Sequence, residues 1–462
     1  MKFFQFIEKL FRTLLPSPFS IAVLLTILTF VIAFLAMDSA SVGFDRVRDL
    51  VGFWEKGLWG EKLLVFAMQM MLMLVLGHVL ALTKPVDRFI SRVTRYCTDT
   101  PKAAAIVTVL TVAVALFNWG LGLIFGAILA RKVGEHAVRH NIKLNYPLIG
   151  AAGYSGLMVW HGGISGSAPI KAAEPNHIKG LMDGVLSSEE ITNLPSSISF
   201  SETVFGSMNI TVSIMLLIAL PLFMYLMGRR SNDAVALPKV EEELAEEVGV
   251  VSGAERLDFA RWFTIIVGGA ITAYTVSTAI DLFPKVGFGF INPNYLNLLL
   301  LGLGILLHTS VRSFLKGVDQ AIGGASGILI QFPLYFGILG IMKHSGLVEQ
   351  LSDFFVANST QSTFPILTFF SSGLVNIFVP SGGGQWAIQG PIIINAAAEL
   401  GVSAPKAIMA LSYGDQITNM LQPFWALPLL GITGLKARSI LPYTFALMLV
   451  GTVLFITVLM LF

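Results

Sequence analysis

One carboxylate stands alone in a long apolar segment near the end of the chain. Asp415 is the only acidic residue between positions 407 and 435. It precedes Asn419 by four residues, so the two share a helical face, with Gln422 about one turn further on. Asn419 and Gln422 are candidates for binding substrate. A buried acid in such a segment costs several kcal/mol unless it is paired. We expect Asp415 to take up a proton or to ligate Na⁺ beside backbone carbonyls; a structural carboxylate held by backbone N–H groups is the alternative.

A cluster of glycines, amides and hydroxyls lies just upstream of this acid. It contains Asn376, Ser381, Gly382, Gly383 and Gln385 within an apolar, charge-free segment, 364–398. Glycines let a backbone approach a ligand closely, and Ser381 could cap the following helix. These residues are candidates for binding substrate, although glycines in membrane helices also serve close packing.

The first half of the chain repeats this pattern. Asn118, Gly120 and Gly122 stand at the middle of a second charge-free segment, 103–130. Because neither segment contains Lys or Arg, a bound anion would be held by N–H groups and neutral side chains. Helix N-termini suit such an anion. This favours a substrate with a single, weakly solvated carboxylate.

A glycine-rich break follows the first of these segments. Ser165 and Ser167 lie within it and are further substrate candidates. His161 occupies the position that Asn419 takes in the other half, five residues beyond a matched glycine. It could bind the carboxylate or relay a proton, and a neutral, hydrogen-bonded core histidine is the alternative.

Composition shows that these residues must be positioned within a membrane. Hydrophobic residues make up 55% of the 462 residues and charged residues 13%, against roughly 25% charged in soluble proteins. The single cysteine, Cys97, excludes an intrachain disulfide. The chain contains no nucleotide-binding P-loop and no metal-ligand cluster. We therefore expect an all-α polytopic membrane protein that is not an enzyme, with no cofactor and no nucleic-acid partner.

Apolar length and interruption predict the elements. Two interrupted spans are expected at 147–178, broken at 162–169, and at 407–435, broken near Gln422. The charge-free segments predict two hairpins, at 103–137 and 364–398, each with arms too short to cross a bilayer comfortably. Continuous spans are expected at 17–37, 63–83, 201–227, 262–283, 296–309, 320–342 and 441–462.

The charges of the loops predict how these elements are oriented. The positive-inside bias places both flanks of the first hairpin in the cytoplasm and both flanks of the second outside, so both hairpins must be re-entrant. The result is about nine transmembrane helices, two opposed hairpins and two broken helices, with a cytoplasmic N-terminus. Residues 1–230 form one repeat and 291–462 an inverted second one. An acidic cytoplasmic linker and the fifth span, 231–290, join them.

The sequence resembles the short-chain fatty acid transporter family almost from end to end. The most specific stretches are 117–122, 379–386, 388–391 and 422–428. The resemblance implies an inverted-repeat fold with hairpins and a carrier of butyrate or acetoacetate in the bacterial inner membrane. Some relatives differ from this chain around His161 and Gln385, which leaves the role of His161 open.

We therefore expect a secondary transporter of short-chain monocarboxylates that symports H⁺ or Na⁺. Coupling is needed because each charge entering a negative interior costs about 2.3 kcal/mol per 100 mV. A dicarboxylate or other organic-anion carrier is the alternative. The expected partners are the substrate, the ion and the lipid bilayer, and a homodimer is open by analogy with the wider fold.

Overall fold

A computed structural model describes residues 16–37, 43–182, 191, 195–231 and 253–462. The acidic run predicted at 241–247 lies outside these ranges. The described residues form helices and no strand. The helices, in order, are α2 (Pro18–Ala36), α3 (Phe44–Leu58), α4 (Glu61–Ala81), α5 (Lys84–Thr94), α6 (Thr100–Phe117), α7 (Trp119–Arg139), α8 (Tyr146–Tyr154), α9 (Ser167–Ala173), α10 (His177–Leu181), α12 (Ser207–Arg230), α13 (Arg256–Phe259), α14 (Arg261–Val286), α15 (Pro293–Leu307), α16 (Val311–His344), α17 (Leu347–Ala357), α18 (Phe364–Phe378), α19 (Gly382–Glu399), α20 (Ala404–Thr418), α21 (Pro423–Thr433) and α22 (Ala437–Leu461).

Seven of the described helices, α2, α4, α6, α12, α14, α16 and α22, are long and apolar enough to cross a membrane. The predicted all-α polytopic membrane architecture is confirmed. α15 has only 15 residues, in line with the short span expected there. α16 has 34 residues and starts nine residues earlier than predicted. Its earlier start follows from Ser310, whose hydroxyl accepts a hydrogen bond from Ser313 N at 3.1 Å and caps the helix.

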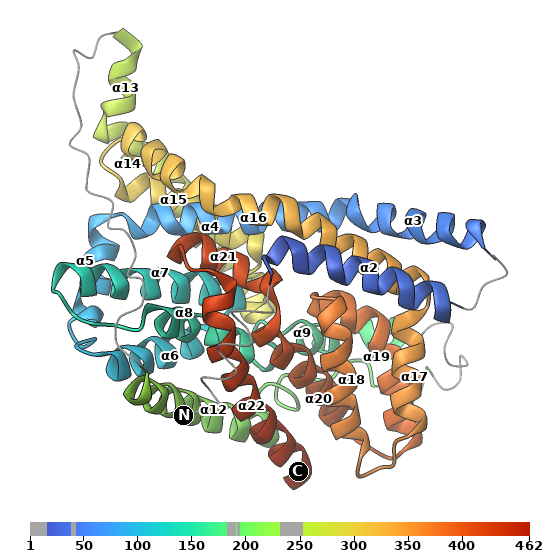
Figure 1. Ribbon diagram of the computed structural model, residues 1–462. Helices are drawn as coiled ribbons and strands as arrows, with labels where there is room; N and C mark the ends of the chain where they lie inside the picture. Colours follow the sequence, from blue (N-terminus) through green and yellow to red (C-terminus); the bar gives the residue numbers. More distant parts are fainter. Residues whose placement is uncertain (1–15, 38–42, 183–190, 192–194, 232–252) are drawn as a thin grey trace.

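Long helices form one layer of the molecule. α3 and α4 follow one another along one edge, with α16 and α2 running beside them (Figure 1). Gly337 and Gly340 let α16 approach α3 closely; a Cβ atom on Gly340 would lie 2.9 Å from Gly57 N. Hairpin two (α18 and α19) lies with α17 and α20 at one end of this layer. Hairpin one (α6 and α7) lies with α8 at the other end, with α21 between the two groups (Figure 1).

Each of the two charge-free segments folds into a pair of helices that meet at a capping residue. Asn118 caps α7 by accepting a hydrogen bond from Leu121 N at 3.0 Å. The arms of hairpin one are longer than expected: α6 has 18 residues and is itself long enough to span. α7 continues past residue 130 through a charged turn because its charges are paired, as in the 2.9 Å contact of Arg131 Nε with Glu135 Oε1.

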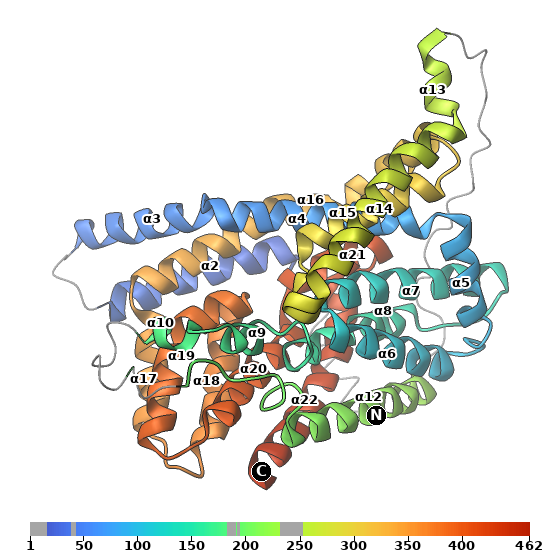
Figure 2. The same ribbon diagram turned by 180° about the vertical axis from the view of Figure 1, so that it is seen from behind.

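Both broken helices are present, with breaks of unequal length. In the second, α20 continues to Thr418, and one 3₁₀ turn, Asn419–Leu421, leads into α21 close to the predicted position. In the first, the α-helix already ends at Tyr154, eight residues before the predicted break. Two short 3₁₀ turns then lead to α9, which lies beside α19 (Figure 2). Side chains from other helices hydrogen-bond the backbone of this break at His161 and Gly162.

Candidate functional site

A cavity of about 250 Å³ lies where the tip of hairpin two meets both breaks. Drug-sized ligands occupy pockets of about 300–1,000 Å³, so this cavity suits a smaller molecule. Its lining combines aromatic and aliphatic walls with a small polar region. The lining residues are Leu63, Phe66, Trp119, Trp160, Ser167, Tyr335, Phe336, Leu339, Pro380, Ser381, Gly382, Gly383 and Trp425.

The polar end of the cavity is the start of α19. The hydroxyl of Ser381 accepts a hydrogen bond from Gly384 N at 3.2 Å, and the first intrahelical bond runs from Gln385 N to Ser381 O at 2.7 Å. The N–H groups of Gly382 and Gly383 precede that bond and have no partner inside the helix. They offer two donors and the positive end of a helix dipole to a ligand.

Two further helix starts contribute to the same cavity. Trp119 is the first residue of α7, and Trp425 lies in the first turn of α21. Within the described part of the chain, no Lys or Arg lines the cavity. The local electrostatics therefore favour an anion through the start of α19 and the Ser381 hydroxyl, without a cationic clamp, whereas α7 and α21 contribute tryptophan side chains.

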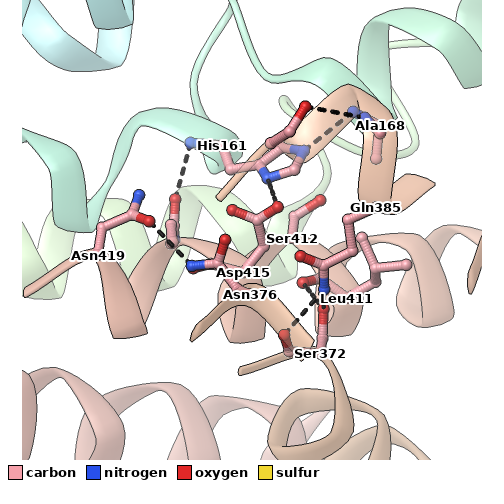
Figure 3. A network of polar contacts seen from close by, with 12 residues as sticks. His161, Ala168, Ser372, Asn376, Gln385, Leu411, Ser412, Asp415 and Asn419 are labelled. Carbon is pink, nitrogen blue, oxygen red and sulfur yellow. Dashed lines mark hydrogen bonds and ion pairs between the residues drawn. The ribbon is translucent and has the colours of Figure 1, made fainter. Parts of the chain in front are cut away.

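An acid–imidazole pair lies next to this polar end (Figure 3). His161 Nδ1 is 3.4 Å from Asp415 Oδ2, and the two side chains are 0% and 1% exposed. His161 Nε2 accepts a hydrogen bond from Ala168 N at 3.0 Å. Because Nε2 is an acceptor, the neutral ring carries its hydrogen on Nδ1, facing Asp415. The structure thus brings together the two residues for which the sequence suggests proton chemistry.

Gly382 separates this pair from the cavity. A Cβ atom at Gly382 would lie 2.8 Å from Trp160 Cη2, 2.9 Å from His161 Cε1 and 3.2 Å from Asp415 Oδ2. Only glycine fits this position without displacing a neighbour. A ligand bound at the start of α19 would therefore be a close neighbour of the Asp415 carboxylate.

Asn376, Asn419 and Gln422 form a polar network behind the pair. Asn376 Nδ2 donates to Asp415 O at 2.6 Å and to Asn419 Oδ1 at 2.9 Å, and Gln422 Nε2 donates to Asn376 O. Asn376 thus bonds both Asp415, through its backbone carbonyl, and Asn419, through its side chain. Apart from the 3.4 Å contact of His161 Nδ1 with Asp415 Oδ2, no donor among the described residues reaches Asp415 Oδ2, Asn376 Oδ1 or Gln422 Oε1. Such oxygens are the ligands that hard cations prefer.

The two breaks are held by side chains that our reading of the sequence missed. Gln416 Oε1 accepts from His161 N at 2.8 Å and from Gly162 N at 3.1 Å. Asn209 Nδ2 donates to Gly162 O at 2.8 Å. The hydroxyl of Tyr154 lies 2.8 Å from Asn419 O. Such bonds are required because unpaired backbone is costly in a membrane interior. Gln416, Asn209 and Tyr154 are polar residues inside apolar segments, and this feature of the sequence could have identified them.

Several predicted site residues lie away from the cavity lining. Asn118 caps α7 and donates to Ile291 O at 3.0 Å, and Ser165 Oγ accepts from Trp119 N at 2.9 Å. Gly120 faces Met73, and a Cβ on Gly122 would lie 2.6 Å from Ala115. These contacts account for the four residues through helix capping and packing at the tip of hairpin one.

Gln385 ties the two arms of hairpin two together. Its Nε2 lies 2.8 Å from Ser372 O and 2.7 Å from Gln389 Oε1, and the side chain is fully buried. Of the predicted substrate residues, Ser167, Ser381, Gly382 and Gly383 line the cavity itself.

The aromatic walls were not predicted. Trp119, Trp160 and Trp425 each stand within three residues of a tip or break, which is a signal that could have identified them. Phe66 and Tyr335 come from uninterrupted helices, α4 and α16, and no local sequence feature distinguishes them.

A second cavity, of about 220 Å³, lies between α5 and α7. Charged residues and histidines dominate its lining, but Lys132 already contacts Asp87 at 2.9 Å and Glu135 at 3.3 Å. Both acidic residues of this cavity are therefore already paired with Lys132. No group of three or more His, Cys, Asp or Glu is arranged to hold a metal ion in the described ranges. The first cavity is therefore the candidate site that we consider further.

Comparison with known proteins identifies the family. The family profile described as Short chain fatty acid transporter matches residues 2–462. The chain belongs to the short-chain fatty acid transporter family. It is 36% identical, over 99% of both chains, to a candidate short-chain fatty acid transporter of Escherichia coli (strain K12). It is 35% identical to one of Haemophilus influenzae, over 96% of this chain and 95% of the relative. This member of the family is thus a multi-pass membrane transporter.

Among solved structures, this transporter is similar to the YdaH transporter of Alcanivorax borkumensis. The sequences are 14% identical, the TM-score is 0.45, and the match covers 96% of this chain and 97% of that one.

Proposed function

We propose that the protein is a secondary active transporter of short-chain monocarboxylates such as butyrate and acetoacetate in the bacterial inner membrane. The observation that carries this proposal is that the cavity is polar at one end and apolar elsewhere. The start of α19 offers N–H groups and the Ser381 hydroxyl to a carboxylate, while aromatic side chains such as Phe66 and Trp425 surround the remaining space. The two relatives from Escherichia coli and Haemophilus influenzae, which are named as short-chain fatty acid transporters, support this substrate class.

A dicarboxylate fits this cavity less well. Its second charge would lie against apolar walls, where an unpaired charge is costly. The absence of Lys and Arg from the cavity lining, within the described residues, leaves that charge without a partner. The monocarboxylate is therefore the better-supported substrate.

Coupling follows from the closeness of Asp415 to the start of α19. At an effective dielectric constant of about 20, two negative charges about 5 Å apart repel by about 3 kcal/mol, which exceeds a hundredfold in affinity. A carboxylate substrate binds well only when Asp415 is neutralised. H⁺ or Na⁺ supplies that neutralisation, and binding of the ion and the substrate favour each other reciprocally.

Each ion has support in the geometry. The Nδ1–H of His161 faces Asp415 Oδ2, which suits a proton shared within the pair. The unpaired oxygens of Asp415, Asn376 and Gln422 suit Na⁺. The two ions are separated by the experiment below.

We also propose that the two halves are inverted repeats and that the hairpins enter the membrane from opposite faces. The N-terminus is then cytoplasmic. Loop charge supports this arrangement: charges flank hairpin one densely, whereas Lys343 and Lys406 are the nearest basic residues on either side of hairpin two.

The proposed function is tested by uptake into proteoliposomes. Radiolabelled butyrate and acetoacetate are offered with an imposed proton gradient, an imposed sodium gradient, both or neither, and succinate is added as a competitor. We expect accumulation driven by one of the two ions and little inhibition by succinate. Absence of uptake of any monocarboxylate contradicts the proposal, and strong inhibition by succinate favours the dicarboxylate alternative.

A further inference from the structure

One face of α19 is covered by the chain that runs from the first break through α9 and α10. We name this chain, residues 160–181, the covering segment. Gly382, Trp386 and Gly390 are four residues apart, so they share this face of α19. Gly382 packs against the first residues of the covering segment, and a Cβ on Gly390 would lie 3.1 Å from Leu181 Cδ2 near its end. Figure 2 shows α9 and α10 beside α19.

A hydrogen bond fastens the middle of this face. Trp386 Nε1 donates to His177 Nε2, at the start of α10, at 3.1 Å. Trp386 is 1% exposed, whereas the side chain of His177 is 26% exposed and reaches solvent. Among the described residues, no other hydrogen bond joins α19 to the covering segment. The rest of the contact is apolar: Ala172 and Ile178 share with Trp386 a hydrophobic cluster that is separate from the main core.

The protonation state of His177 decides whether this bond forms. An indole nitrogen only donates, so His177 Nε2 must be unprotonated to accept from Trp386. A protonated imidazole carries hydrogen on both nitrogens and would place one N–H group against another. The bond is then lost and the buried N–H of Trp386 is left unpaired, which weakens the contact between α19 and the covering segment. Histidine is the side chain that changes its charge in the physiological pH range.

Two opposite charges lie near the ring of His177. Glu174 Oε2 is 3.9 Å from His177 Nδ1, and Lys171 Nζ is paired with Glu174 Oε1 at 2.7 Å. Because these two charges offset each other, the pH of the surrounding water governs the charge of His177. The further ionisable side chains on α10, α19, α20 and the segment 195–206 are Lys179, Glu202, Glu399, Lys406 and Asp415.

We propose that His177 is a positioning residue for transport. In its neutral form it fastens α19 to the covering segment, and with α19 it holds the Gly382 end that borders the cavity. Its protonation releases α19 and lets hairpin two move away from the covering segment. The inference rests on the proposed transport function and holds for any substrate bound at the start of α19. Because hairpin two enters from outside in the proposed orientation, His177 responds to external pH.

Hydrogen–deuterium exchange measures the release directly and needs no substrate. The full chain is purified in detergent and exchanged at about one pH unit above and about one below 6.5, the ordinary pKa of histidine. The rates are corrected for the intrinsic effect of pH. At the lower pH we expect the protection of peptides from α10 and α19 to fall about fivefold, the effect of losing one hydrogen bond. Peptides from α14 should keep their protection.

Two substitutions separate the proton from the bond. His177→Gln keeps an oxygen that can accept from Trp386 but takes up no proton, so protection should stay high at both pH values. His177→Leu removes the acceptor, so protection should be low at both. His344→Gln is the matched control, because His344 is an exposed histidine at the end of α16. Its substitution should leave the wild-type pH response unchanged.

Butyrate counterflow in proteoliposomes shows whether the release matters for transport. At the lower pH, His177→Gln should exchange butyrate about fivefold more slowly than the wild-type protein, and at the higher pH equally fast. Equal protection of α19 at both pH values in the wild-type protein, or a wild-type pH response in His177→Gln, overturns the inference. Equal counterflow of the two proteins at the lower pH overturns the role in transport. If protection changes as expected but neither protein moves any monocarboxylate, His177 still fastens α19 and the proposed transport function fails.

Discussion

The two hairpins share a sequence pattern but use their polar groups differently. In hairpin one, Asn118 caps α7 and bonds the backbone of Ile291, and Ser165 satisfies the N–H of Trp119. In hairpin two, Ser381 caps α19 and also lines the cavity, where Gly382 and Gly383 present free N–H groups. The first tip is closed by contacts within the protein, and the second is open to a ligand.

The two broken helices also differ, and again the polar side chain next to the cavity belongs to the second half of the chain. Asp415 lies in the second, next to the cavity, and the matched position in the first is the buried Leu157. Asn419 Nδ2 donates to Leu157 O at 3.3 Å, so the two breaks meet at this point. The comparison teaches that two segments with the same sequence pattern can differ in use, because the polar groups of the first are bonded within the protein and those of the second border the cavity.

The largest effect is expected from adding one methyl group at the tip of hairpin two. Gly382→Ala would force its Cβ against the rigid ring of Trp160, at 2.8 Å, and against His161. We expect the rate of butyrate uptake to fall about tenfold or more, about 1.4 kcal/mol in transition-state free energy. Gly323→Ala is the control, because Gly323 is exposed on α16, does not line the cavity, and no atom of the described residues lies within 4 Å of its Cβ. Equal uptake rates in the two variants would contradict the placement of the site.

A smaller effect is expected from substitutions that distinguish the ligand-binding role of Ser381 from its role as a helix cap. Ser381→Ala and Asn118→Ala each remove a helix cap, which costs about 1 kcal/mol of stability. Only Ser381 also contacts the cavity, and a hydrogen bond to a charged ligand is worth about 1.5–3 kcal/mol. We expect similar decreases in Tm for the two variants but a KM raised about tenfold in Ser381→Ala alone. A raised KM in Asn118→Ala would show that both tips bind substrate.

The smallest effect on transport is expected from cysteine substitutions that test how the two hairpins are oriented in the membrane. Cys97 is buried, and burial raises the pKa of its thiol to about 12, so the natural chain reacts slowly with maleimides. Ser362→Cys and Ser403→Cys, which flank hairpin two, should react with an impermeant maleimide in intact cells. Thr98→Cys and Lys143→Cys, which flank hairpin one, should react only after permeabilisation. Labelling of the two ends of one hairpin from opposite sides would show that it crosses the membrane.

Local sequence features predicted where helices turn or break. They did not predict which side chains line the cavity. Asn118 and Ser381 mark the tips because capping depends on neighbouring residues, and Asp415 is conspicuous in apolar sequence. The contact of Asp415 with His161 joins residues 254 positions apart, and the cavity-lining residues Leu63 and Leu339 lie on uninterrupted helices. Such contacts depend on how helices pack, which no local pattern encodes.

The central claim is that Asp415 couples substrate binding to an ion gradient. Asp415→Asn keeps the size of the side chain but cannot carry the charge that an ion must neutralise. We therefore compare two modes of butyrate movement in the same proteoliposomes, gradient-driven accumulation and counterflow at equal butyrate concentrations, with Leu157→Met as the control in the other half. The account predicts that Asp415→Asn loses accumulation and retains counterflow, whereas Leu157→Met retains both. Accumulation by Asp415→Asn at the wild-type level, with unchanged pH and Na⁺ dependence, would contradict it.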